Sequence, residues 1–232
     1  MTSRADANER LRAARLYLIL EARVGGRRAA EIAAPALEGG VDLVQLRDKR
    51  AGDDEIVAAG RELRAVCEER GALLVVNDRP DLALRCAAHG VHLGQDDARV
   101  EDVRAEMGER LFIGLSTHTP AQVDAAERSP ADYFAVGPVY ETPTKPGRAA
   151  VGLELVRYAA EHASKPWFAI GGIDAGNADA VAGAGGRRIA VVRAIRDASD
   201  PEAAARALRA AVEKEAAAQQ LRGAVETEAP VG

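Results

Sequence analysis

Two basic side chains and a glutamine stand where an apolar run gives way to charged residues. The run begins at Leu43 and continues into Gln45, Arg47 and Lys49 at alternate positions. Residues two apart on an extended chain share a face, so these three side chains can point together. Two cations that converge in a sheltered site need an anion between them. Phosphate or pyrophosphate suits, because Arg offers a planar fork and Lys a point charge. From this motif alone, a strand that leaves the core into a charged surface turn is an equal alternative.

Acidic side chains follow the next two apolar runs. Asp78 comes after Asn77, and Asp96 and Asp97 come shortly after the following run. Strands that neighbour each other lie about 5 Å apart, so carboxylates at their ends can share one cation. Mg2+ is usually held by one or two carboxylates with substrate phosphates and water, so this acidic set and the Arg/Lys pair explain each other. The alternative role is helix capping, and one of Asp96 and Asp97 is expected to do only that.

A polar loop further along the chain adds candidates for anion binding. Thr142, Thr144 and Lys145 lie in a connection that is long for a strand followed by a helix. Long loops in compact folds are often lids or binding loops, and two hydroxyls with one ammonium suit phosphate oxygens. The alternative is a mobile surface loop.

Two turns near the C-terminal end of the chain have the composition of a phosphate-binding cup. Gly171-Gly172 follows one apolar run, and Val192-Arg193 ends the next. Glycines let the backbone approach an anion closely, and loops after the last two strands of a barrel bind phosphate through backbone N–H groups. A pair of glycines alone could be a simple turn.

These residues require elements that bring strand ends together. Short apolar runs alternate with Ala-rich amphipathic stretches, which indicates parallel strands covered on both faces by helices. Eight such repeats fit a single (β/α)8 TIM barrel, and an open doubly wound sheet is the structural alternative. The eight expected strands are Leu16–Leu20, Leu43–Leu46, Leu73–Val76, Val91–Leu93, Leu111–Leu115, Tyr133–Val136, Trp167–Ile170 and Ile189–Val192. The expected helices are Arg27–Leu37, Asp54–Arg70, Pro80–Ala88, Val100–Met107, Pro120–Glu127, Leu153–Ala163, Ala175–Ala182 and Pro201–Gln220.

Length and composition agree with one barrel. The chain has 232 residues, near the ~250 typical of this fold, and 47% of them are hydrophobic. We expect an N-terminal extension over 1–14, a barrel over 15–220 and a disordered polar tail over 221–232. The net charge of −5 argues against nucleic acid as a partner. No run is long enough for a membrane span or a signal peptide, so we expect a cytoplasmic protein. A homo-oligomer is compatible with the sequence.

The histidines and cysteines are not expected to do the chemistry. Cys67 and Cys86 lack metal-ligand or redox spacing and are interpreted as buried thiols. His89 lies near a helix end, where a solvated or capping role is expected, and His92 lies within a strand as a hydrogen-bonded structural residue. His118 stands at a strand end near the site, but we do not assign it as a catalytic base.

The motif set resembles the thiamine-phosphate synthase (thiamine-phosphate pyrophosphorylase) family. The matching segments occur in the family's order across nearly the whole barrel, and together they are specific. They are Gln45-Leu46-Arg47-Asp48-Lys49, Asn77-Asp78-Arg79, Val91-His92-Leu93-Gly94-Gln95-Asp96-Asp97, Gly114-Leu115-Ser116-Thr117-His118, Gly137-Pro138-Val139-Tyr140 with Thr142-Pro143-Thr144-Lys145, and Ile170-Gly171-Gly172-Ile173.

The resemblance implies a reaction and a role for each site residue. The reaction is Mg2+-dependent transfer of the aminopyrimidine-methyl group from its pyrophosphate ester to hydroxyethylthiazole phosphate, which gives thiamine phosphate and pyrophosphate. The pyrophosphate ester would be bound by Gln45, Arg47, Lys49, Asn77 and Lys145, and Mg2+ by Asp78 and Asp97. Ser116 would approach the pyrimidine or the leaving pyrophosphate, so that Arg47, Lys49, Ser116 and Lys145 are the catalytic set. The thiazole phosphate would be received by Thr142, Thr144, Gly172 and the backbone of Val192 and Arg193.

One position departs from the pattern of the family. Arg193 stands where the family usually has Ser. Its guanidinium could strengthen the grip on the acceptor phosphate or crowd the cup. Three rival functions are a thiazole tautomerase-like isomerase, a non-catalytic thiamine-phosphate-binding protein and a sugar-phosphate epimerase. The cationic motif together with Asp78 and Asp97 disfavours all three.

Overall fold

Eight parallel strands close into a barrel in the computed structural model, which describes residues 4–142 and 149–227 and the side chains as far as residue 214. Around the barrel each strand pairs with the next one along the chain, and the last strand pairs with the first. The strands are β1 (Leu16–Leu20), β4 (Leu43–Leu46), β5 (Leu73–Asn77), β6 (Gly90–Leu93), β7 (Phe112–Thr117), β8 (Tyr133–Val136), β9 (Trp167–Ile170) and β10 (Ile189–Val191). The single (β/α)8 barrel is therefore confirmed, and the open-sheet alternative is wrong.

The helices follow the strands as the alternation of patterns predicts. They are α2 (Ala29–Glu38), α3 (Asp53–Glu69), α4 (Pro80–Arg85), α5 (Val100–Met107), α6 (Pro120–Arg128), α7 (Gly152–His162), α8 (Ala178–Gly183) and α10 (Pro201–Thr227). Three elements were not predicted: helix α1 (Arg4–Ala13), a short helix α9 (Arg193–Arg196) and a small hairpin of β2 (Arg23–Val24) and β3 (Arg27–Arg28). The hairpin occupies the place where the sequence predicted the start of the first helix. Gly25 and Gly26 have positive φ and turn the chain there, so the helix begins only at Ala29.

Successive residues of each strand face opposite sides of the barrel wall. In β1, for example, Leu16, Leu18 and Leu20 pack outward against the helices, whereas Tyr17 and Ile19 belong to the cluster inside the barrel. The same alternation places polar residues of other strands on the inner side at the positions where the apolar inner cluster ends. The alternation of side chains thus determines which residues can reach the barrel mouth.

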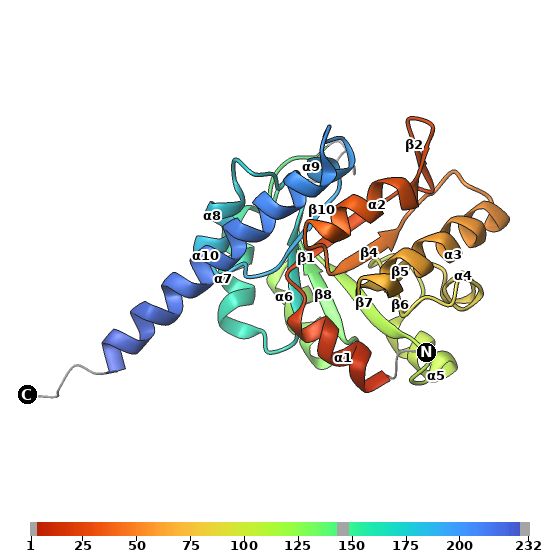
Figure 1. Cartoon of the computed structure of the whole chain (residues 1–232). Coiled ribbons are helices and arrows are strands. Elements are labelled where there is room, and N and C mark those ends of the chain that lie inside the picture. The colour runs from red at the N-terminus through yellow and green to blue at the C-terminus, as the bar shows by residue number, and fades with distance from the viewer. Residues whose placement is uncertain (1–3, 143–148, 228–232) are drawn as a thin grey trace, which may run out of the picture.

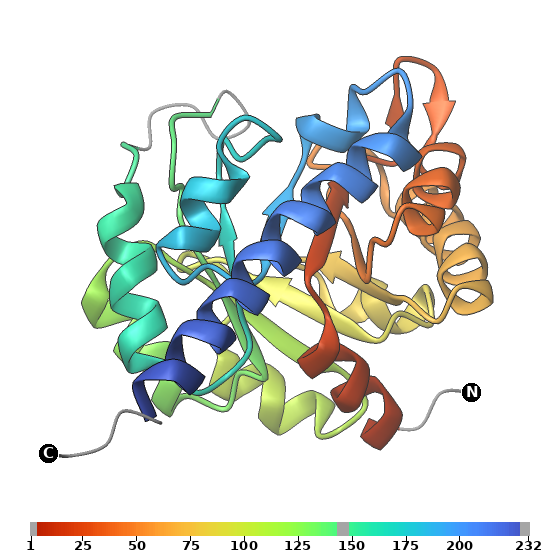
Figure 2. The ribbon, with the colours of Figure 1, turned by 60° about the vertical axis from the view of Figure 1, so that its left-hand side comes forward.

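The N-terminal segment closes the end of the barrel opposite the mouth. Helix α1 (Arg4–Ala13) buries Ala7 and Leu11 in the inner cluster, next to Phe112 and Leu73. Figures 1 and 2 show α1 at the lower end of β1, whereas the β2–β3 hairpin and α9 lie at the upper end. The described part of the segment expected as an extension therefore forms a helix that packs against the closed end of the barrel.

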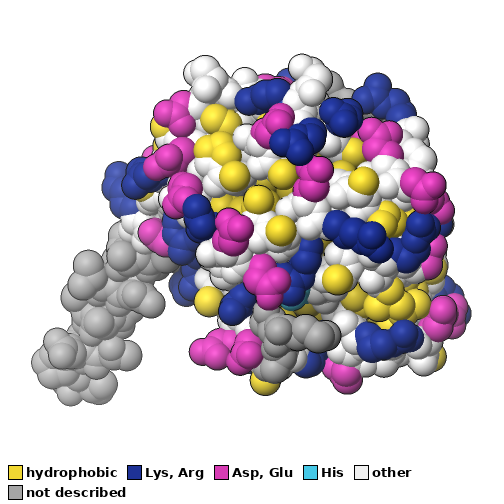
Figure 3. Space-filling view, turned by 45° about the vertical axis from the view of Figure 1, so that its right-hand side comes forward, with side chains coloured by type: hydrophobic (Ala, Val, Ile, Leu, Met, Phe, Trp, Pro, Cys, Tyr) yellow, Lys and Arg dark blue, Asp and Glu magenta, His cyan; other side chains and the backbone are white. Residues whose placement is uncertain are grey.

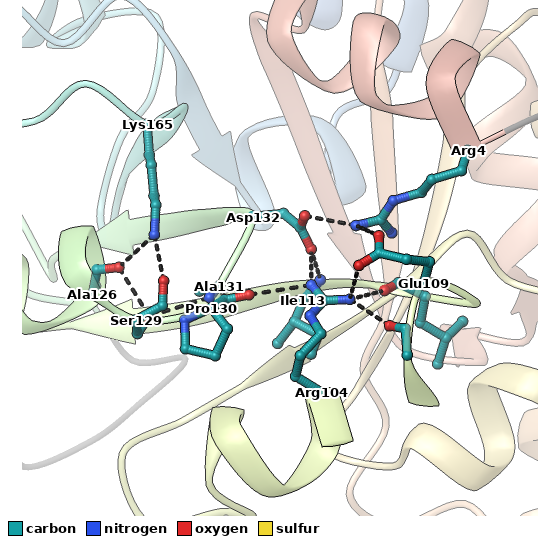
Figure 4. Close-up of polar contacts among 12 residues, drawn as sticks. Arg4, Arg104, Glu109, Ile113, Ala126, Ser129, Pro130, Ala131, Asp132 and Lys165 are labelled. Atoms are coloured by element: carbon teal, nitrogen blue, oxygen red, sulfur yellow. Dashed lines mark hydrogen bonds and ion pairs between the residues drawn. The ribbon is translucent and has the colours of Figure 1, made fainter. Parts of the chain in front are cut away.

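A network of charges fastens this helix to the barrel wall. The carboxylate of Asp132, just before β8, accepts hydrogen bonds from the Arg4 guanidinium (2.6 Å), the Arg104 guanidinium (2.5 Å) and the backbone N–H of Ile113 (2.7 Å). Arg4 also pairs with Glu109 at 3.3 Å. Figure 4 shows that these residues converge from α1, α5 and the turns before β7 and β8. Because one carboxylate accepts from three donors, these residues form a connected network. Such a network contributes more to the stability of the fold than isolated surface ion pairs do.

The other end of the chain is a long helix. Helix α10 continues past residue 220, where the barrel was expected to end, and in Figure 1 its last turns stand away from the barrel. Helix therefore reaches Thr227 in the segment expected to be a disordered tail, and disorder over 221–232 stays a prediction.

None of the described helices has the length and apolarity to span a membrane. Acidic and basic side chains are interspersed over the face drawn in Figure 3.

Cys67 and Cys86 are buried free thiols, as predicted, but His89 has a different place from the one expected. His89 is partly buried, and its Nδ1 accepts a hydrogen bond from the backbone N–H of Leu74 at 2.9 Å. Burial, followed by the charges of Arg64 and Arg10, lowers the pKa of His89 to about 4. The imidazole therefore stays neutral in the native protein while it would be protonated in the unfolded chain below pH ~6.5.

This difference predicts an acid-dependent loss of stability. Between pH ~6.5 and about 4 the unfolded chain binds the extra proton at His89, so the free energy of unfolding falls as the pH falls, by up to about 1.4 kcal/mol per pH unit. We expect His89→Gln to be less stable at pH 7, because the Leu74 hydrogen bond is weakened, but to lose less stability on acidification. Urea unfolding of both proteins at pH 7, 6 and 5 measures this. Equal pH slopes would contradict the assignment of a low pKa to His89.

Candidate active site

A cavity of about 380 Å3 opens at the C-terminal ends of the strands. This volume is within the range of small-molecule sites. Of the predicted site residues, the cavity is lined by Gln45, Arg47, Asn77, Ser116, Thr142, Gly172, Val192 and Arg193. These residues come from the ends of β4, β5, β7, β9 and β10 and from the loop after β8. The barrel thus assembles in one cavity residues that are as far apart in the sequence as Gln45 and Arg193.

The Arg/Lys motif after β4 divides between two adjoining cavities. Gln45 and Arg47 line the main cavity, whereas Lys49 lines a second cavity of about 280 Å3. Asn77 lines both, so the two spaces meet at the end of β5. The expectation that the three alternate side chains share one direction therefore holds for two of them. Asp48, between the cations, accepts hydrogen bonds from the backbone N–H groups at the start of the next loop and forms its turn.

Lys49 and two carboxylates meet beside this second cavity. The Lys49 ammonium lies 3.3 Å from the carboxylate of Asp78. Burial, then the neighbouring Asp97 carboxylate, raise the pKa of Asp78, while the charge of Lys49 opposes that rise. Two carboxylates in contact repel each other in their ionised forms, and a divalent cation between them would remove the repulsion.

Asp78 has an unusual backbone conformation. Its φ is +61°, in the left-handed region that few residues other than glycine adopt. Its backbone N–H donates to the carbonyl of His92 on the neighbouring strand at 2.8 Å, which holds the turn in place. Such a conformation is unfavourable by about 1 kcal/mol or more, and residues strained in this way cluster at active sites and ligand-binding sites. The sequence shows no sign of this feature.

The structure separates the roles of Asp96 and Asp97. Asp97 is half-buried and interacts with Asp78, and its carboxylate also accepts a 2.7 Å hydrogen bond from the backbone N–H of Gly94. Asp96 is exposed. Neither caps α5, which begins after Arg99 without a side-chain cap. The expectation that one of the pair is only a helix cap is therefore wrong for this helix.

The glycines after β9 form one wall of the main cavity. Gly171 and Gly172 have φ of +106° and +64°. A Cβ at Gly171 would lie 2.5 Å from Pro138, and a Cβ at Gly172 would lie 2.7 Å from the Tyr140 side chain. Both the backbone conformation and the close packing against the loop after β8 therefore require glycine here.

The turn from β10 into α9 continues this wall, because β10 pairs with β9. Val192, Arg193 and Ala194 line the cavity there, and the first N–H groups of a helix have no acceptor within the helix. Helix α9 is held by Arg196, whose guanidinium donates to Asp197 (2.7 Å) and to Glu21 (2.7 Å) at the end of β1. Asp197 also lines the cavity, and its hydrogen bonds from Arg196, with a smaller effect of the Arg193 charge, lower its pKa.

Buried polar residues that the sequence did not single out lie under the cavity. Tyr17 and His92 line it from inside the barrel, and Tyr133 hydrogen-bonds to both. Tyr17 and Tyr133 lie in apolar runs of the sequence. The alternation of side chains along a strand predicts that they face the barrel interior, but nothing in the sequence indicates a polar role for their hydroxyls. His92 does form hydrogen bonds, as predicted for a structural histidine, but its partners include Ser116 of the site. His118 also lines the cavity, with its ring against the carbonyl of Gly137.

Three of the predicted residues lie beside the main cavity and not in its lining. Lys49 and Asp78 line the adjoining one, and Asp97 lies next to Asp78. Thr144 and Lys145 lie outside the described residues. Among the residues that the structure describes, no three His, Cys, Asp or Glu side chains form a metal-binding group, so a magnesium site here would depend on two carboxylates.

Comparisons with known proteins agree with this site. A family model described as thiamine monophosphate synthase matches residues 16–195. The chain is 52% identical over 204 residues to the thiamine-phosphate synthase of Saccharopolyspora erythraea, with 84% of this chain and 92% of that protein covered. It is 51% identical over 199 residues to the thiamine-phosphate synthase of Thermobifida fusca, with 85% and 91% covered.

A solved structure is similar over nearly the same length. The thiamine phosphate pyrophosphorylase from Pyrococcus furiosus is 35% identical and has a TM-score of 0.80, with 90% of this chain and 98% of that chain covered. Sequence and structural similarity thus extend over the whole barrel rather than over isolated motifs. The chain belongs to the thiamine-phosphate synthase family and is an enzyme of thiamine biosynthesis.

Proposed function

We propose that this barrel mouth joins 4-amino-2-methyl-5-hydroxymethylpyrimidine pyrophosphate to hydroxyethylthiazole phosphate, with Mg2+ as cofactor and pyrophosphate as leaving group. The observation that carries the proposal is the contact of Asp78 with Asp97 beside Lys49, next to a cavity lined by Gln45 and Arg47. Carboxylates on one side and cations on the other suit a metal-bound pyrophosphate.

The donor set fits a magnesium ion. Asp78 and Asp97 supply oxygen ligands, and burial together with the neighbouring Asp97 carboxylate raises the pKa of Asp78, so a bound cation would favour the ionised pair. Mg2+ is commonly bound by two carboxylates, with water and substrate phosphates as its other ligands. When bound, the ion would neutralise charge that develops on the departing pyrophosphate.

The side chains of this chain would do the rest by electrostatics and positioning. Arg47 and Lys49 would hold the pyrophosphate and favour its departure as charge grows on the bridging oxygen. The bond from the pyrimidine methylene carbon to that oxygen breaks, and the thiazole nitrogen forms the new bond to the same carbon. Gln45, Asn77 and Ser116 would orient the aminopyrimidine and its ester. We assign Lys145 to the pyrophosphate as well, on the resemblance of its motif.

A second anion site would receive the acceptor. Gly172 and the backbone of Val192 and Arg193 line the far wall of the main cavity, and Thr142 lines it from the loop after β8. We assign the thiazole phosphate to this cup, together with Thr144. Holding both substrates in one mouth brings the thiazole nitrogen to the reacting carbon and supplies proximity. A cytoplasmic location and a homo-oligomer stay predictions.

Purified protein with both substrates tests the proposal directly. We expect thiamine phosphate and pyrophosphate to appear with Mg2+ and turnover to stop with excess chelator. Asp97→Asn should raise the Mg2+ concentration needed for half-maximal rate by at least about tenfold, as loss of a ligand carboxylate weakens metal binding. The matched control is Asp96→Asn, on the exposed neighbour, which should keep the wild-type Mg2+ dependence. Equal effects of the two variants would contradict the assignment of Asp97.

Arg47 is expected to act mainly in the transition state. Arg47→Ala should lower kcat by about 100-fold or more, because charge on the leaving group then develops without the guanidinium. Its fold should persist, since no hydrogen bond or ion pair of the Arg47 guanidinium occurs within the described ranges. Steady-state rates and circular dichroism of the purified variant measure this. A folded variant with wild-type kcat would remove Arg47 from the catalytic set.

Arg193 is expected to strengthen the acceptor site. Asp174 and Asp197 also line the main cavity, so the positive charge of Arg193 offsets two acidic neighbours where the phosphate must bind. Arg193→Ser should therefore raise KM for the thiazole phosphate by a few-fold, and more at low ionic strength, since the side chain is exposed and screened. KM for the pyrimidine substrate serves as the internal control. A lower acceptor KM in Arg193→Ser would show that the guanidinium crowds the cup.

A further inference from the structure

Five polar side chains form a continuous hydrogen-bonded chain beneath the cavity. The side-chain amide of Gln45 donates to the Tyr17 hydroxyl at 2.5 Å, and the Tyr17 and Tyr133 hydroxyls are 3.0 Å apart. The Tyr133 hydroxyl is 3.0 Å from Nδ1 of His92, whose Nε2 is 3.0 Å from the Ser116 hydroxyl. The chain therefore runs across the barrel and joins two of the residues assigned to the pyrimidine substrate, Gln45 and Ser116.

All five side chains are buried, so their hydrogens have few acceptors. Tyr17 and Tyr133 are at most 1% exposed, and Gln45, His92 and Ser116 are at most 7% exposed. Burial raises the pKa of both phenols, so each keeps its hydrogen. A buried hydroxyl whose hydrogen has no acceptor destabilises the folded protein. The hydrogens must therefore be arranged so that each one is used.

This requirement fixes which group donates and which accepts in each hydrogen bond of the row. The Tyr17 hydroxyl accepts from Gln45, and its only other partner among the described residues is the Tyr133 hydroxyl, so Tyr17 donates to Tyr133. Tyr133 must then donate to Nδ1 of His92. A neutral histidine with an unprotonated Nδ1 carries its hydrogen on Nε2, which donates to Ser116. The hydroxyl hydrogen of Ser116 is left to point toward the cavity.

The barrel is built to permit this path. His92, Gly114 and Tyr133 are register partners on three adjacent strands, so Gly114 lies between the two residues that must touch. A Cβ at position 114 would lie 2.2 Å from the Tyr133 ring. Glycine there lets the phenol cross over β7 and reach the imidazole. Phe168 packs edge-on against the rings of both tyrosines at 5.3 and 5.9 Å and holds them in place.

We propose that Tyr17, Tyr133 and His92 are positioning residues that make Gln45 a hydrogen-bond acceptor and Ser116 a donor toward the aminopyrimidine. Because the amide nitrogen of Gln45 donates to Tyr17, the amide oxygen of Gln45 can accept a hydrogen bond from a ligand in the cavity. The hydroxyl hydrogen of Ser116 can donate one to the same ligand. An aminopyrimidine carries the complementary pair: an exocyclic amino group that donates and a ring nitrogen that accepts. The chain thereby selects a ligand with donor and acceptor at those positions, and this inference rests on the proposed function.

The hydrogen-bonding roles of Gln45 and Ser116, at the two ends of this row of hydrogen bonds, depend on each other. If the Gln45 amide were turned over, each hydrogen bond would have to reverse, which moves the histidine hydrogen to Nδ1 and leaves Ser116 as an acceptor. Binding of a ligand with the opposite pattern would therefore require reversal of every bond between Gln45 and Ser116. A single tautomer of His92 reports the direction of the whole chain.

The kinetic test removes one hydroxyl and keeps the ring. Tyr133→Phe should raise KM for the pyrimidine pyrophosphate by about tenfold, because His92 and Ser116 lose their fixed direction, while KM for the thiazole phosphate stays within about twofold. Phe168→Leu is the packing control, since it loosens the same rings without changing a hydrogen bond. It should lower the melting temperature and leave the ratio of the two KM values as in the wild type. In a Ser116→Ala background, Tyr133→Phe should have little further effect on the pyrimidine KM.

The spectroscopic test reads the histidine directly. Nitrogen NMR of histidine-labelled protein at neutral pH should show His92, assigned through His92→Gln, with Nε2 protonated and Nδ1 unprotonated, and Tyr133→Phe should disturb both signals. A protonated Nδ1 in the wild type, or an unchanged ratio of KM values in folded Tyr133→Phe, would overturn the inference. Either result would leave Mg2+-dependent formation of thiamine phosphate by the wild type untouched. Absence of that product would instead overturn the proposed function.

Discussion

The closed parallel barrel imposes one constraint on which the rest of the molecule depends: neighbouring residues of each strand face opposite sides of its wall. Tyr17 faces inward because Leu16 and Leu18 face outward, and the same rule directs Gln45, His92 and Ser116 to the interior. A shift of one residue in any strand would exchange its inner and outer faces. Packing of the apolar outer face against the helices therefore also determines the position of the polar inner residues.

The side chains inside the barrel change from apolar to polar and then to charged between its closed end and its mouth. At the closed end, α1 and large apolar side chains such as Phe112 fill the space, and the Asp132 network holds that end together. In the middle the tyrosines bring polar atoms into the buried layer without charge. At the mouth stand charged groups such as Arg47 and Asp78, where water and substrate can reach them. Charge is thus confined to the places where it can be neutralised, in accord with the high free energy of burying an unpaired ion.

The mouth itself balances opposite charges in two places. On one side Lys49 pairs with Asp78, which also interacts with Asp97. On the other side Arg193 stands near Asp197, and Arg196 neutralises Asp197 and Glu21. The two proposed anion sites therefore differ in kind. The first relies on charged side chains and a metal, and the second relies mainly on backbone N–H groups at turns where Gly171 and Gly172 admit close approach.

The sequence by itself determined the barrel and the polar residues that follow each of its strands. Both can be predicted because the spacing of hydrophobic residues, and the polar residues after each apolar run, are local properties of the sequence. Those same properties led to Arg47, Asp78 and Gly172. Tertiary structure decided which side chains share a space. Asp97 is half-buried beside Asp78 whereas Asp96 is exposed, and Lys49 lines the adjoining cavity instead of the one lined by Gln45 and Arg47. The hydrogen-bonded chain through Tyr17 and Tyr133 also depends on register across several strands, and no local pattern encodes a contact between residues more than a hundred positions apart.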